Sequence, residues 1–162
     1  FSKISASSGI DVYIVQGDKE SVTVEADENL LELIVTRVKG DKLIIKTEES
    51  IRRAKKLNVY VTLVMVDEIS VSSGSDLESR SLIKAGTLDI SVSSASSGSD
   101  LKASDLKALE CKAKASSGGD VSVYAVESIE AHASSGGDVS YYGNGSFADK
   151  STFLPHSGQL TV

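Results

Sequence analysis

A five-residue motif, Ser-Ser-Gly-(Ser/Gly)-Asp, recurs between residues 72 and 138 and restricts the folds that the chain can adopt. Its four copies carry the central glycines Gly74, Gly98, Gly118 and Gly136, which follow one another at intervals of 24, 20 and 18 residues. A related copy stands at 7–11 and a shortened one at 157–160. Glycine adopts positive φ without steric cost, and Ser and Asp hydrogen-bond the local backbone, so each copy predicts a tight turn.

Segments in which apolar and polar residues alternate lead into and out of these turns, as at 109–113 and 121–124. Alternation with a period of two is typical of strands that bury one face. We expect the apolar set to point inward: Leu109, Cys111, Ala113, Val121, Val123, Ile129, Ala131 and Val139. The intervening residues, Lys112, Lys114, Ser122 and Glu130, should be exposed.

The recurrence of one turn with similar flanks indicates coils that stack by translation, so that equivalent residues occupy equivalent places. The predicted fold is therefore all-β: a single-stranded, right-handed β-helix-like solenoid with about three short strands to a coil. A β-sandwich, which also has short strands at regular spacing, is the alternative. We expect one domain over residues 1–162, with irregular outer coils at 1–66 and regular repeats at 67–162. Residues 27–34 predict a helical turn with Asp27 as its N-cap.

The formal net charge of −6 excludes nucleic-acid binding, because recognition of a phosphate backbone requires a basic surface. One basic cluster, Arg52, Arg53, Lys55 and Lys56, is expected in a solvated loop, with an anionic ligand as the alternative. No apolar run approaches the ~18 residues that a membrane span needs. No signal peptide is visible and the chain begins at Phe1, so we expect a mature or trimmed chain.

The sequence shows no catalytic pattern. Cys111 is the only cysteine and alternates with apolar residues, which favours a buried structural thiol over a nucleophile. His132 lies between two alanines and should point outward. A Gly-x-Ser-x-Gly elbow, a His/Cys metal spacing and a Gly-rich phosphate loop are all missing. We therefore predict a protein that is not an enzyme and needs no cofactor.

The motif copies end in Asp76, Asp100, Asp120 and Asp138, which stacking would align in a ladder with a spacing of ~4.8 Å. Each carboxylate is expected to accept backbone N–H groups of its own turn. A bound hard cation such as Ca²⁺ is the alternative, so these four residues are the metal candidates. Tyr142 and Phe147 are candidates for an aromatic ligand face, and the other interpretation is a hydrophobic cap over the last coil.

The order of several segments resembles a known family. These segments are Gly9-Ile10-Asp11-Val12, Val15-Gln16-Gly17-Asp18, the run 24–31, the serial turns and the run 137–143. Together they are similar to the head domain of auto-transporter adhesins, known as the head GIN domain. The resemblance spans nearly the whole chain and implies a β-helical fold in secreted or envelope proteins of Gram-negative bacteria. It implies no catalytic residues.

Three functions are compatible with these observations. The first is an extracytoplasmic surface module, an adhesin head that binds an unknown protein or glycan. The second is a polysaccharide-active β-helix enzyme, which would need long loops that the short turns do not supply. The third is a scaffold of the cell envelope whose coils self-associate through open strand edges, giving a homo-oligomer. We expect the chain to lie in the periplasm, on the outer membrane or outside the cell.

Overall fold

The computed structural model describes residues 1–49, 51, 54, 56–93, 98–143 and 146–147. Its elements are thirteen strands and one short 3₁₀ helix. In chain order they are β1 (Lys3–Ala6), β2 (Asp11–Gln16), β3 (Ser21–Ala26), η1 (Glu28–Leu33), β4 (Ile34–Lys39), β5 (Lys42–Thr47), β6 (Leu57–Leu63), β7 (Glu68–Ser72), β8 (Asp76–Ser79), β9 (Ile83–Ser93), β10 (Asp100–Ser116), β11 (Asp120–Ser134), β12 (Asp138–Tyr142) and β13 (Ser146–Phe147). The all-β class predicted from the sequence is confirmed.

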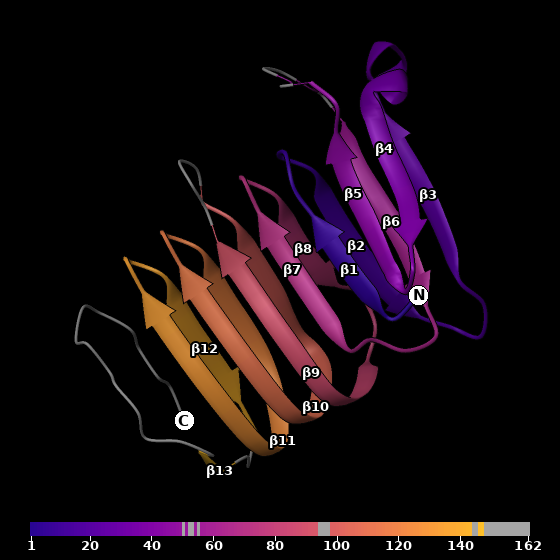
Figure 1. The fold of residues 1–162 in the computed structure, drawn as a ribbon. Helices are drawn as coiled ribbons and strands as arrows, with labels where there is room; N and C mark the ends of the chain where they lie inside the picture. The colour runs from indigo at the N-terminus through magenta and orange to yellow at the C-terminus, as the bar shows by residue number, and fades with distance from the viewer. Residues whose placement is uncertain (50, 52–53, 55, 94–97, 144–145, 148–162) are drawn as a thin grey trace.

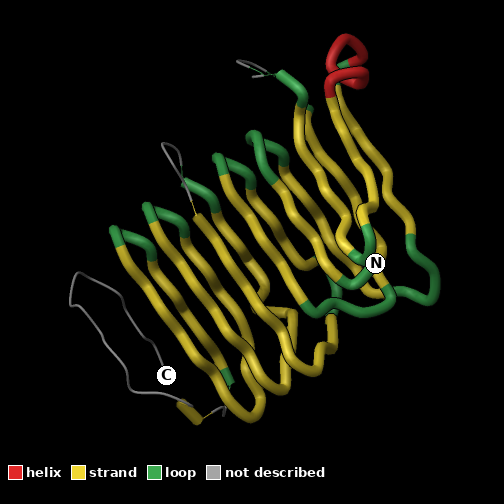
Figure 2. Tube along the Cα trace, viewed as in Figure 1, coloured by secondary structure: helices red, strands yellow, loops and turns green. Residues whose placement is uncertain are grey.

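The strands form one mixed sheet that folds back on itself, nearly closing like a flattened barrel (Figure 1). One layer contains β6, β2, β8, the first part of β10 and β12, and the other contains β5, β1, β7, β9 and the last part of β10. The long strands β10 and β11 bend and pass from one layer to the other (Figure 2). Between successive motif turns the chain therefore runs as two strands (β8 and β9) or as one long bent strand (β10 or β11), not as three short strands.

Parallel pairing places the motif copies in equivalent positions. Leu101 pairs with Leu77 on β8 and with Val121 on β11, and Val121 pairs in turn with Val139 on β12. On the other layer, β10 pairs in parallel with β9 from Leu106 to Ser116. The green turns therefore follow one another along one edge of the sheet in Figure 2.

The N-terminal strands, β1 to β6, lie together at one end of the folded sheet (Figure 1), but they are not arranged in chain order. Strands β1 and β2 lie inside the stack, where β1 pairs in parallel with both β5 and β7, and β2 with both β6 and β8. At this end of the sheet the edge strands are β3 and β4, and each runs antiparallel to its neighbour, β6 or β5. The predicted helical turn is η1, which begins after Asp27, although the Asp27 side chain makes no capping hydrogen bond.

The predicted tight turns share an unusual backbone conformation. In three motif copies both the second serine and the glycine have positive φ, for example 56° at Ser73 and 75° at Gly74. The turn closes with a hydrogen bond from the Ser75 amide to the Ser72 carbonyl at 3.2 Å, which defines a type I′ turn. The same geometry recurs at Gly118 and Gly136. Gly98 lies beside Gly118, but residues 94–97 of its turn lie outside the described residues.

The inward-facing side chains confirm most of the predicted alternation. Six of the eight expected residues are buried: Cys111, Ala113, Val121, Val123, Ile129 and Val139. Ala131 is partly buried against the core, and Ser122 is intermediate rather than exposed. The prediction for Leu109 is wrong, because its side chain is 46% exposed. The pairing of β10 with β11 shifts between Ala108 and Glu110, and this irregularity turns Leu109 out of the inward set.

Candidate binding face

Four of the five tyrosines lie on the outer side of one layer. Tyr60 on β6, Tyr13 on β2, Tyr124 on β11 and Tyr142 on β12 are all partly or fully exposed, whereas Tyr141 is buried. They occupy outward positions in the layer that contains β6, β2, β8, β12 and the first parts of β10 and β11. The outward positions of β7, β9 and the last part of β10 carry no tyrosine and are mostly Ser, Lys, Asp and Glu. We call the first of these surfaces the tyrosine face.

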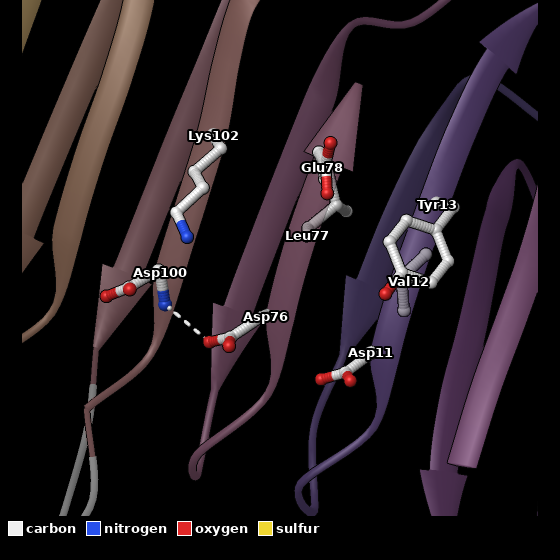
Figure 3. Close-up of a pocket in the computed structure, with 8 residues that line it drawn as sticks. All are labelled: Asp11, Val12, Tyr13, Asp76, Leu77, Glu78, Asp100 and Lys102. Carbon is white, nitrogen blue, oxygen red and sulfur yellow. Dashed lines mark hydrogen bonds between the residues drawn. The ribbon is translucent and has the colours of Figure 1, made fainter. Parts of the chain in front are cut away.

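A column of five carboxylates runs along the turn-side end of the tyrosine face. Parallel pairing aligns Asp11 with Asp76, Asp100 with Asp120, and Asp120 with Asp138. Asp76 and Asp100 are joined directly, since the Asp100 amide donates to Asp76 Oδ1 at 3.0 Å (Figure 3). The expectation that each Asp caps its own turn is therefore wrong for Asp76, whose carboxylate binds the next coil. The ladder of aspartates predicted from the sequence did not include Asp11.

Burial and the neighbouring carboxylates raise the pKa of two members of the aspartate column, Asp11 and Asp100. Partial burial and the neighbouring carboxylate of Asp76 raise the pKa of Asp11. Burial, Asp76 and Asp120 raise the pKa of Asp100, and Lys102 opposes this increase. A carboxyl group whose pKa is raised on folding binds protons more tightly in the folded state. Asp11 and Asp100 thus contribute most to stability at low pH, and this contribution is lost as the pH rises from the ordinary Asp pKa through their raised pKa in the folded state.

Removing one charge from the aspartate column should therefore stabilise the protein at neutral pH. We expect Asp100→Asn to raise the melting temperature at about pH 7 and to have little effect near pH 3.5, where the raised pKa of Asp100 favours its protonated form. The hydrogen bond from the Asp100 backbone to Asp76 is unaffected by this substitution. Asp18→Asn, on an exposed residue away from the column, is the control with the same charge change. Thermal denaturation at both pH values measures the difference, and equal shifts for the two variants would contradict this account.

An open depression of ≈ 140 Å³ lies on the tyrosine face next to the aspartate column. Its lining residues are Asp11, Val12, Tyr13, Asp76, Leu77, Glu78, Asp100 and Lys102, from strands β2, β8 and β10 (Figure 3). Four of these residues carry a carboxylate and one carries an ammonium group. We call this feature the acidic depression.

An aromatic cluster that also contains an arginine borders the acidic depression. The rings of Tyr13 and Tyr60 stack with a centroid distance of 5.3 Å, and Arg80 Cζ lies 3.5 Å from the centroid of the Tyr13 ring. The Tyr60 hydroxyl donates to Glu25 Oε2 at 3.1 Å, and Lys56 Nζ donates to Glu25 Oε1 at 2.7 Å. These contacts lower the pKa of Glu25, with the Lys56 hydrogen bond as the main cause. The cluster is therefore held in place before any partner binds.

The structure separates the site residues predicted from the sequence. Tyr142 is 49% exposed at the end of the tyrosine face. Phe147 lies on β13, but its side chain is outside the described residues, as are Arg52, Arg53 and Lys55. Among the residues that the structure describes, no group of three or more His, Cys, Asp or Glu side chains is arranged to hold a metal ion.

The two side chains considered for catalysis, Cys111 and His132, do not have the properties that a catalytic role requires. Cys111 is a buried free cysteine, and burial, with a smaller effect of Asp89, raises the pKa of its thiol to about 12. The thiolate that a nucleophile requires is therefore not populated at neutral pH. His132 is exposed, as predicted, on the layer opposite the tyrosine face.

The sequence analysis missed Tyr13, Tyr60 and Arg80. A signal for the two tyrosines was present, because Asp11-Val12-Tyr13 and Asn58-Val59-Tyr60 have the same polar–apolar–aromatic pattern. The tyrosines meet because β2 pairs with β6 in parallel, with Tyr13 opposite Tyr60. The residues are 47 positions apart in the chain, so their proximity could be predicted only from the strand order.

Comparison with known families gives one match, which extends over most of the chain. The family described as "Putative auto-transporter adhesin, head GIN domain" matches residues 1–97 and 92–145. No curated protein matches the chain. Among the described residues, no helix is long and apolar enough to cross a membrane.

Solved structures share the fold at low sequence identity. A putative adhesin from Bacteroides fragilis NCTC 9343 has a TM-score of 0.61 and 21% identity, covering 91% of this chain and 86% of its own. A putative lipid binding protein from Parabacteroides distasonis ATCC 8503 has a TM-score of 0.50 and 16% identity, covering 91% and 87%. At these identities the likeness concerns the fold.

Proposed function

Because this chain belongs to the putative auto-transporter adhesin head GIN domain family, we propose that it is a non-enzymatic interaction module that acts at the cell surface or elsewhere outside the cytoplasm. Its architecture is a β-solenoid, in which stacked coils present the tyrosine face as one continuous surface. The observation that carries this proposal is the family match, which extends from residue 1 to residue 145.

The composition of the tyrosine face supports an interaction role. Tyr and Arg are enriched in protein interfaces because each combines a large contact area with hydrogen-bonding groups. Tyr13, Tyr60 and Arg80 meet on this face and are fixed by stacking and by Glu25. A preorganised cluster loses little side-chain entropy when a partner binds.

The enzyme alternative has less support. The thiol of Cys111 is buried and un-ionised at neutral pH, and the exposed His132 lies on the other layer from the acidic depression. A glycosidase would use two carboxyl groups with different protonation states on either side of a bound sugar. The carboxylates of the aspartate column instead lie side by side along one edge of the sheet.

A surface-binding experiment tests the proposed function. The folded chain should bind to a subset of features on arrays of glycans and purified extracellular proteins, or to intact cells, without consuming any of them. The same chain after thermal unfolding is the control, and static light scattering of the free chain reports the self-associating scaffold alternative. Turnover of an acidic polysaccharide that Asp120→Asn abolishes would contradict the proposal, and so would binding no stronger than that of the unfolded control.

A further inference from the structure

We propose that the acidic depression and the adjoining Tyr13–Arg80 pair form a docking site for an extended, basic segment of a partner protein. Lysine or arginine side chains of that segment would enter the depression between Asp11, Asp76 and Asp100. This inference rests on the proposed function and gives it a location and a class of partner.

Charge complementarity is the first argument. Asp11, Asp76, Glu78 and Asp100 line the depression, and Lys102 is the one cationic side chain among its lining residues. The aspartate column continues beyond it to Asp120 and Asp138, so negative charge extends along the face. A partner that supplies positive charge would relieve the repulsion between these carboxylates, which a neutral partner would not do.

The aromatic side chains give an independent argument, because two of them already bind cations within the chain. The Arg80 guanidinium lies 3.5 Å from the centroid of the Tyr13 ring, and Lys107 Nζ lies 4.9 Å from that of Tyr124. Both contacts fall within the range of cation–π attraction. The Tyr13 and Tyr124 rings are occupied by these internal cations, so the contacts support the proposal by showing that Lys and Arg side chains are accommodated on the tyrosine face.

The same contacts disfavour a glycan at this position. Arg80 and Tyr60 contact the Tyr13 ring, which leaves less of it as a flat platform for a sugar. An anionic glycan or a nucleic acid would face the aspartate column and be repelled. An extended peptide suits the open depression, because its side chains can reach the depression while its backbone crosses the strands.

Fluorescence anisotropy with labelled pentalysine tests the site on the full chain at low salt. The face variant Asp76→Asn/Glu78→Gln/Asp100→Asn removes three charges, and the amide oxygen at position 76 can still accept the Asp100 N–H bond. The control variant Asp89→Asn/Glu110→Gln/Glu130→Gln removes three charges from exposed residues outside the tyrosine face. We expect the Kd to rise at least about tenfold in the face variant and less than about threefold in the control variant.

Other results would overturn the docking site. Equal losses in both variants would mean that pentalysine responds only to net charge. Binding of fully acetylated, uncharged pentalysine with the same Kd would mean that positive charge is not recognised. An array that shows the face variant losing a glycan rather than basic proteins would assign the face to a sugar instead.

The surface-binding assay separates this inference from the proposed function. If wild type binds surfaces and the face variant binds them equally well, the docking site is wrong while the interaction module stands. If wild type itself binds no surface, the proposed function fails, whatever the pentalysine titration shows.

Discussion

Replacing Cys111 with Asp should unfold the protein, whereas the same replacement at Leu109, two residues earlier on β10, should leave it folded. Cys111 is 2% exposed in the core between β9 and β11, where its thiol already has a pKa of about 12. A carboxylate there would be desolvated, with Asp89 nearby as a further repulsion. The expected loss is about 5 kcal/mol, comparable to the whole stability of many domains.

The Leu109→Asp control differs because this side chain is 46% exposed at the irregularity of β10. Its expected cost is below about 1 kcal/mol. Urea denaturation followed by circular dichroism measures both variants. Similar losses at the two positions would show that the inward and outward residues of β10 are assigned incorrectly.

The second large effect concerns two adjacent glycines in the last described turn. A Cβ atom at Gly137 would lie 2.7 Å from the backbone carbon of Ala115 and 2.7 Å from the backbone nitrogen of Ser116. These are main-chain atoms of the neighbouring coil and cannot rotate away. We expect Gly137→Ala to cost about 3 kcal/mol, because the two coils must separate to admit the methyl group.

Gly136→Ala is the matched control. Gly136 has a φ of 80° and open space around it, so Ala there carries only the cost of a left-handed backbone, about 1 kcal/mol. The measurement is the free energy of unfolding of both variants in urea. A larger loss at Gly136 than at Gly137 would contradict the close approach of the last two turns.

Much of the repeat could be predicted from the sequence because its signals are local. The Ser-Ser-Gly motif predicts tight turns, and the alternation on either side predicts which face of each strand is buried. The identical turns imply the aligned aspartates, since strands that follow equal turns and pair in parallel place equal residues side by side. Even so, the positive φ of Ser117 and Ser135 was not foreseen, because this conformation is uncommon for residues other than glycine.

The remaining features depend on strand order, which a single sequence does not specify. Strands β1 and β2 are first in the chain, yet β1 lies between β5 and β7, and β2 lies between β6 and β8. The N-terminal segment is therefore flanked on both sides by strands that come later in the sequence. This insertion brings Tyr13 beside Tyr60 and puts Asp11 at the head of the aspartate column. The irregularity at Leu109 could not be predicted either. Leu109 alternates with polar residues in step with Cys111 and Ala113, so the pattern places it in the inward set, whereas the shift in strand pairing turns it outward.

Chemical-shift mapping by NMR tests the docking site most directly. Titration of the ¹⁵N-labelled chain with pentalysine should shift the backbone amides of β2, β8 and the first part of β10, around Tyr13, Glu78 and Lys102. The amides of β1, β7 and β9, which lie on the other layer, should stay in place. Shifts concentrated on β1, β7 and β9, or spread evenly over both layers, would contradict a basic-segment site on the tyrosine face.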